Sequence, residues 1–361
     1  MPIEVRATLD RQVPVYLAGE TVVVSVVLTN CKPAGERGHS ETIAWGSVQL
    51  SSERTNAKAR NQKTQLTTSI PRSNTCVYSS VPSILFCDIN VLPGDSKTYT
   101  YEVQLPLTGL LPSFRGNLVR FQNRITVAVQ HLKSPIKMIH LPIRLVPDVG
   151  IESRKPICRN PFLDATTSAP PIAEMFAATV DQITAPKKEF IYQMTNSRGR
   201  VAALMLYKRA FKLGEDVVGK LSFQVADVRC YQWLVRLVSL ESLVETDPSA
   251  EKPSSTIVWA TQHKISADFA ETAFRVPIAL DAPPTFSNDI VHIKWQLQFE
   301  FVTSSSYQPA AALEDIRPTN APVNVDIETL SWQVDLFVLS CSPFNIALTD
   351  TSANGETMVV I

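Results

Sequence analysis

Tyr16-Leu17-Ala18-Gly19-Glu20-Thr21-Val22-Val23 and, much later, Phe211-Lys212-Leu213-Gly214-Glu215-Asp216-Val217-Val218 repeat one pattern. Each stretch has an aromatic residue, two intervening residues, a Gly-Glu pair and then an apolar run. Two further echoes keep the same order along the chain. Extended runs end at Pro106 and at Pro277, and Pro112-Ser113-Phe114 and Pro284-Thr285-Phe286 each precede a long strand-like run. The repetition predicts one β-domain plan used twice.

The composition fits this plan and weighs against a nucleic-acid partner. The chain has 361 residues, which is enough for two domains of about 150 residues each. Its 34 basic and 34 acidic residues balance, so no net field would concentrate a phosphate backbone, and we expect no nucleic-acid partner. The 25 prolines outnumber the 12 glycines, which suits many short strands joined by turns.

The sequence also indicates the compartment. The start Met1-Pro2-Ile3-Glu4-Val5 alternates like a strand and lacks the basic and apolar regions of a signal peptide. No apolar run reaches the roughly 18 residues of a membrane span, so we expect any membrane contact to be peripheral. The six cysteines are scattered and no Asn-x-Ser/Thr site is present. We therefore expect a cytoplasmic protein with reduced thiols.

Alternating hydrophobicity predicts an all-β chain. Apolar and polar residues alternate over residues 3–9, 295–301 and 332–338, which is typical of strands with one buried face. Residues 22–28 are apolar on nearly both faces, as in a central strand. No helical crossovers alternate with these strands, so we predict two β-sandwiches rather than an α/β fold.

The strand pattern stops at Pro147-Asp148-Val149-Gly150, where a polar, proline-rich stretch begins. We predict an N-terminal sandwich over 1–149, a linker over 150–189 with a helix at 171–185, a C-terminal sandwich over 190–342 and a tail over 343–361. The tail ends in Met358-Val359-Val360-Ile361, which we expect to add as a strand to an edge of the chain's own sheet; a partner's sheet is the alternative.

The predicted helix carries an apolar stripe at helical spacing. Such a stripe usually packs against the chain's own core, and the alternative is a helix that binds a partner. The candidate partner-binding residues are Ile172, Met175, Phe176, Val180 and Ile183. A second irregular segment, 51–75, is basic; it is interpreted as a solvated loop, with adsorption to an anionic membrane surface as the alternative.

Gly214-Glu215-Asp216-Val217-Val218-Gly219-Lys220-Leu221 matches a phosphate-binding loop except at its last position, where Leu221 replaces Ser or Thr. The apolar run continues as a strand instead of opening a helix, and the copy at Gly19 has no equivalent lysine. We interpret both glycines as turn residues.

The chain also lacks local zinc-ligand spacing and the common catalytic motifs. We therefore predict no catalytic, cofactor-binding or metal site and no enzyme activity. His131 and Cys87, which apolar strand residues flank, are expected in or near the core.

The duplicated plan resembles the arrestin fold over nearly the whole chain. A narrower resemblance is to the retrograde Golgi transport protein family. It rests on residues 84–89, 92–101, 112–116, 199–201, 213–219 and 299–304.

This resemblance implies a non-catalytic, arrestin-like subunit of a heterodimeric guanine-nucleotide exchange factor. The implied partners are a larger β-propeller subunit and a Rab-six-type small GTPase, on the Golgi membrane, in retrograde endosome-to-Golgi transport. The alternative is a retromer-type or arrestin-type cargo adaptor. The chain lacks the Pro-Pro-x-Tyr motif of ubiquitin-ligase adaptor arrestins. A carbohydrate-acting sandwich enzyme would need paired carboxylates, which no motif marks.

Overall fold

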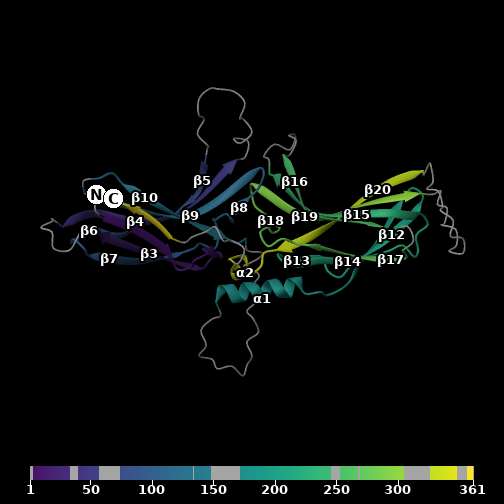
Figure 1. Ribbon diagram of the computed structural model, residues 1–361, viewed down its shortest axis with the longest axis horizontal. Helices are drawn as coiled ribbons and strands as arrows, with labels where there is room; N and C mark the ends of the chain where they lie inside the picture. Colours follow the sequence, from purple (N-terminus) through teal and green to yellow (C-terminus); the bar gives the residue numbers. More distant parts are fainter. Residues whose placement is uncertain are drawn as a thin grey trace, which may run out of the picture. The chain divides into compact units, whose positions relative to one another are not determined.

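The chain folds into two compact units that are rich in β-strands. The structure is a computed structural model, and it describes residues 3–32, 40–56, 74–132, 134–147, 171–244, 253–266, 269–304, 326–347 and 356–360. The first unit comprises Met1–Thr179 with Ser340–Ile361, and the second comprises Val180–Leu339 (Figure 1). The predicted all-β, two-domain fold class is confirmed.

Two sheets form the first unit. The smaller has the order β21-β1-β3-β7, and the larger has the order β2-β10-β9-β4-β5, with β6 on β4 and β8 on β9. The strands are β1 (Ile3–Leu9), β2 (Val15–Tyr16), β3 (Thr21–Asn30), β4 (Glu41–Asn56), β5 (Asn74–Ser79), β6 (Ser83–Val91), β7 (Ser96–Gln104), β8 (Phe114–Arg115), β9 (Val119–His131), β10 (Lys137–Leu145) and β21 (Glu356–Val360).

The second unit repeats this arrangement. Its smaller sheet has the order β11-β12-β14-β17 and its larger sheet the order β13-β20-β19-β15-β16, with β18 on β19. The strands are β11 (Phe190–Asn196), β12 (Gly199–Leu206), β13 (Ala210–Lys212), β14 (Asp216–Ser222), β15 (Arg229–Leu243), β16 (Ser254–Ile265), β17 (Glu271–Pro277), β18 (Phe286–Ser287), β19 (Val291–Ser304) and β20 (Ile327–Leu339).

The smaller sheets of the two units match strand for strand. They differ only in which part of the chain supplies the first edge strand. β1, β3 and β7 correspond to β12, β14 and β17, and all these neighbours are antiparallel. In the second unit β11 precedes β12 directly in the chain. In the first unit the equivalent place beside β1 is taken by β21, from the C-terminal end. The expectation that the tail pairs with the chain's own sheet is confirmed.

The cores follow the predicted alternation. Val22, Val24, Val26 and Leu28 of β3 are buried, and β3 lies between β1 and β7 as expected of a central strand. In the second unit, Trp295, Leu297, Phe299 and Phe301 of β19 are buried. The Phe299 ring lies 5.6 Å from that of Phe274 in the opposite sheet. These apolar layers supply most of the driving force for folding.

Three details differ from the predictions. The described residues hold two helices instead of one: α1 (Ile172–Thr184) and α2 (Pro343–Ala347), the second too short for periodicity to reveal. Residues 51–56, assigned to an irregular segment, continue β4, and residues 57–73 lie outside the described residues. Cys87 is exposed, because strand alternation turns Phe86 inward and its neighbour outward. His131 is buried, as expected.

Candidate functional site

The first Gly-Glu pair forms a closed turn between β2 and β3. Gly19 has φ +84°, a conformation that glycine adopts without the steric cost other residues meet. Its backbone nitrogen donates to the Leu105 carbonyl at 3.1 Å, and the Leu105 nitrogen donates to the Glu20 carbonyl at 3.0 Å. The turn therefore joins the start of β3 to the end of β7.

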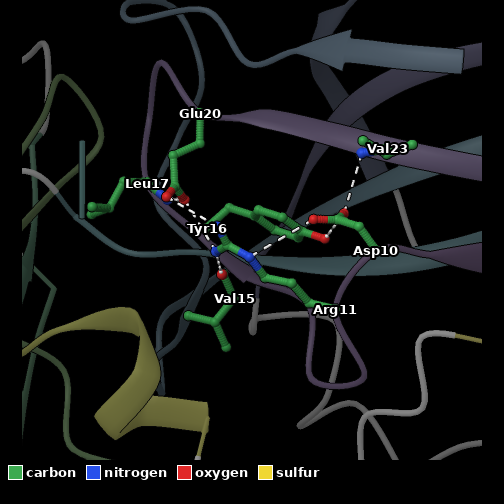
Figure 2. A network of polar contacts seen from close by, with 7 residues as sticks. All are labelled: Asp10, Arg11, Val15, Tyr16, Leu17, Glu20 and Val23. Atoms are coloured by element: carbon green, nitrogen blue, oxygen red, sulfur yellow. Dashed lines mark hydrogen bonds and ion pairs between the residues drawn. The ribbon is translucent and has the colours of Figure 1, made fainter. Parts of the chain in front are cut away.

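The Glu20 side chain folds back over this turn and carries a polar network (Figure 2). Its carboxylate is buried and accepts a hydrogen bond from the Leu17 nitrogen at 2.8 Å. Arg11 donates to the same carboxylate at 3.0 and 3.2 Å, and its guanidinium lies 4.4 Å from the centre of the Tyr16 ring. The cation is thus held between a carboxylate and an aromatic face.

Asp10 extends this network to the neighbouring strand. The Tyr16 hydroxyl donates to Asp10 Oδ1 at 2.7 Å, and the Val23 nitrogen donates to the same oxygen at 3.2 Å. Burial raises the pKa of the Tyr16 phenol, and the hydrogen bond to Asp10 raises it further. Tyr16 therefore stays a neutral donor, and the network fixes the turn rather than offering a group for acid or base chemistry.

The second Gly-Glu pair repeats the first at the level of single hydrogen bonds. Gly214 has φ +85°, and its nitrogen donates to the Ile278 carbonyl at 3.1 Å. The Ile278 nitrogen donates in turn to the Glu215 backbone carbonyl at 2.9 Å. The Glu215 carboxylate accepts from the Lys212 nitrogen at 3.1 Å. Lys208 takes the place of the arginine, at 2.7 Å from this carboxylate and 5.1 Å from the centre of the Phe211 ring.

The echo at Ser113 and Thr285 is equally specific. The Ser113 nitrogen donates to the Leu145 carbonyl at 2.9 Å, and the Leu145 nitrogen donates to the Ser113 hydroxyl at 2.9 Å. Thr285 makes the same pair of bonds with Val338, at 2.6 and 3.0 Å. The repeated motifs are therefore clamps at strand ends, which explains why they recur without marking a chemical site.

The structure supports the interpretation of residues 214–221 as a turn and strand. The residues after the turn form β14, so no helix N-terminus faces the glycines. Gly219 lies against Phe274: a Cβ atom there would come within 2.4 Å of the ring. Lys220 pairs with Glu271 of β17. The second glycine thus makes room for a core aromatic ring, and the lysine joins two strands.

Helix α1 begins after Pro171, whose carbonyl accepts from the nitrogens of Glu174 and Met175. Its C-terminal end is held by two lysines of the second unit. Lys208 donates to the Thr184 carbonyl at 3.0 Å, and Lys212 pairs with Asp181 at 2.7 Å. Cations near the last turn also complement the helix dipole.

The predicted stripe of α1 divides into buried and accessible parts. Phe176 and Val180 are 2% and 4% exposed, so the chain itself covers them. Ile172 and Met175 are half-buried, and Ile183 is 37% exposed. A partner could therefore reach Ile183, Met175 and Ile172, and the partner-binding role of the stripe stays a prediction.

The described residues contain no group of three or more His, Cys, Asp or Glu side chains arranged to hold a metal ion. His131 lies 3.0 Å from Glu41, which also pairs with Lys32 at 2.7 Å. The hydrogen bond from Lys32 makes the largest contribution, and together the two contacts hold the pKa of Glu41 below its usual value despite partial burial. Within the described part of the chain, no helix is both long and apolar enough to cross a membrane.

Comparison with known proteins gives a consistent result over both units. The model of the Rgp1 family matches residues 11–162 and 163–304. The chain belongs to the Rgp1 family. It is 32% identical over 380 residues to a human protein named RAB6A-GEF complex partner protein 2, covering 94% of this chain and 95% of the relative. The protein of the same name from Bos taurus is 31% identical over 373 residues, covering 92% and 93%.

Membership of the Rgp1 family confirms the narrower, family-level resemblance drawn from the sequence. The family match includes both Gly-Glu turns, the clamp between Ser113 and Leu145, and the whole of α1. It ends before β20, α2 and β21, so the strand that completes the first unit's smaller sheet lies beyond the matched residues. The cation in each turn was not predicted, because Arg11 and Lys208 precede their aromatic residues by different spacings.

Proposed function

We propose that this protein is a non-catalytic, arrestin-like subunit of a two-protein exchange factor that activates a Rab-six-type GTPase. One observation carries the proposal: similarity to relatives named as complex partners extends over more than nine-tenths of the chain and of each relative. Because both sandwiches and the intervening helix are included, the relatives share the whole scaffold and not a single module. The named role of those relatives is therefore the best available guide to the role of this chain.

The second subunit in this proposal is a larger β-propeller protein, and the complex acts on the Golgi membrane in retrograde endosome-to-Golgi transport. A subunit of this kind needs no catalytic side chain. Exchange is promoted by any complex that binds the nucleotide-free GTPase more tightly than the nucleotide-bound form, because differential affinity shifts the population. The chain contributes surfaces that hold the larger subunit and orient the GTPase.

The experiment is nucleotide release from the purified GTPase, followed with a fluorescent guanine nucleotide. The larger subunit is assayed alone, with this chain, and with an unrelated β-sandwich protein as the control. We expect this chain to accelerate release or to stabilise the larger subunit against unfolding. No effect on either quantity would contradict the proposal, and retention of receptor tails in a pull-down that does not retain the larger subunit would favour the cargo-adaptor alternative.

A further inference from the structure

Strand β16 is the longest edge strand among the described residues, and it carries little protection. It ends the order β13-β20-β19-β15-β16, and among the described residues it pairs with β15 alone. Its twelve residues, Ser254 to Ile265, include no proline and a single charged residue, Lys264. Proteins normally blunt long edges with prolines, charges or a covering segment, because unpaired backbone groups recruit other strands.

Two other edges of the described sheets are covered. β21 covers the outer edge of β1. β17 is covered by side chains of β16: Gln262 accepts from the Arg275 nitrogen at 3.1 Å, and Lys264 donates to the Ala273 carbonyl at 2.8 Å. The lone charge of β16 is thus turned toward β17 and leaves its own edge neutral.

Exposed apolar side chains accompany this edge. Val258 is 52% exposed, Ile265 is 70% exposed and Phe269, just beyond the strand, is 63% exposed. A hollow of about 570 Å³ opens at the Ile265 end. Its lining comes from β16, the following turn and β17: His263, Lys264, Ile265, Phe269, Glu271 and Thr272. The two charged groups already have partners, since Lys264 donates to the Ala273 carbonyl and Glu271 pairs with Lys220.

We propose that β16 receives an extended, uncharged segment of the larger subunit as an added strand, with one apolar side chain of that segment in the hollow. This inference rests on the proposed function and assigns it a docking surface. Backbone hydrogen bonds along β16 supply affinity, and the hollow sets the register, as in other cases of strand addition. The neutral edge fits an uncharged segment, since a charge opposite Val258 or Ile265 would lose water without gaining a partner.

A second copy of this chain fits the edge less well. Antiparallel pairing of two identical strands about a twofold axis, in the register that pairs all twelve residues, places Ser254 opposite Ile265 at each end. An exposed isoleucine would then face a serine twice. The hollow would also receive no apolar side chain, because the Ser254 end of the strand is polar.

Hydrogen exchange of the purified complex tests the proposal directly. In an antiparallel edge strand, every second amide points outward and exchanges quickly. We expect these alternate amides of β16 to exchange quickly in the free chain and to become protected in the complex. Peptides from β11, another edge strand of the second unit, serve as the control and should not change.

Substitutions on β16 provide a second test of the proposal. Val258→Lys with Ile265→Lys should weaken binding of the larger subunit at least tenfold and leave the melting temperature within a few degrees. The matched control is Ile191→Lys on β11, which is 63% exposed and should leave binding unchanged. If the double variant does not fold, exchange of the unsubstituted complex decides alone.

The outcomes separate the two proposals. A complex that forms with β16 still exchanging quickly overturns this inference and leaves the proposed function standing. Failure to form any complex overturns both. Concentration-dependent protection of β16 in the chain alone, at twice the monomer mass, would assign the edge to a second copy and also overturn the inference.

Discussion

The Glu20 carboxylate accepts a hydrogen bond from the Leu17 backbone nitrogen, three residues earlier, at 2.8 Å. The same relationship recurs between Glu215 and Lys212 at 3.1 Å. In each unit the glutamate closes its own turn and neutralises a cation that lies near an aromatic ring. The two copies of the turn therefore make the same hydrogen bonds, so matched substitutions can be compared in both units.

Replacing Glu20 should destabilise the first unit more than replacing Glu215 destabilises the second. Glu20→Ala leaves Arg11 and the Leu17 nitrogen without their acceptor in a site where the glutamate side chain is only 10% exposed. We expect a loss of about 2 to 3 kcal/mol in the free energy of unfolding. Glu215 and Lys208 are 25% and 20% exposed, so Glu215→Ala should cost about 1 kcal/mol. Urea denaturation measures both.

The control for this pair is Glu102→Ala. Glu102 is exposed on β7, and a surface substitution of this kind should change the free energy of unfolding by no more than about 0.5 kcal/mol. Equal losses for Glu20→Ala and Glu102→Ala would show that the buried network contributes nothing to stability.

Gly219 should resist substitution because of the ring beside it. Its added Cβ would lie 2.4 Å from Phe274, which is 2% exposed and cannot move into solvent. We expect Gly219→Ala to cost about 2 to 3 kcal/mol by overpacking.

The double variant Gly219→Ala with Phe274→Leu identifies the cause. If overpacking against the ring explains the loss, the two substitutions will be non-additive and the double variant will recover part of the stability. Additive losses would place the strain elsewhere. Unchanged stability in Gly219→Ala would contradict the close packing of this glycine against the Phe274 ring.

Acid should weaken the first unit through Glu41. Lys32 and His131 hold the folded-state pKa of this carboxyl below its ordinary value. Folding therefore gains stability above the ordinary carboxyl pKa, and that gain is lost as the pH falls through the lower, folded-state pKa. Between pH 7 and pH 3, the free energy of unfolding should fall less in Glu41→Gln than in the unsubstituted chain. Identical pH dependence in the two proteins would contradict this assignment.

Thiol reactivity should follow burial. Cys31, Cys76 and Cys87 are exposed, whereas Cys230 is buried and burial raises its pKa to about 11. Since the thiolate is the reactive form, we expect the three exposed thiols to be alkylated quickly at pH 8 and Cys230 only after unfolding. Site-resolved mass spectrometry distinguishes them, and rapid alkylation of Cys230 in the folded protein would contradict the burial.

Much of the fold could be predicted because its signals are local. The Gly-Glu turns place their glycines in the left-handed region, a local requirement. The Ser113 and Thr285 clamps directly follow the prolines of the repeated motif. The sequence predicted that β21 joins a sheet edge but not which strand it pairs with, because its partner β1 lies at the other end of the chain.

The candidate site was less accessible to the sequence. Helical spacing identified the stripe of α1 but could not tell Phe176, which the chain buries, from Ile183, which remains accessible. Both are apolar and both fit the period. The difference comes from which neighbouring strands and loops cover each side chain, and that information is not contained in the periodicity.

Helix α1 gives a last test that separates folding from partner binding. Phe176→Asp places a charge in a side-chain position that is 2% exposed, so it should cost more than about 3 kcal/mol and says little about partners. Ile183→Asp changes a side chain that is 37% exposed and should lower stability by about 1 kcal/mol or less. If the accessible side of the helix contacts the larger subunit, Ile183→Asp will weaken assembly at least tenfold by co-purification and titration. Glu174→Ala, at an exposed position of the same helix, is the matched control. Full assembly of Ile183→Asp would contradict a partner contact at Ile183, the most exposed position of the stripe.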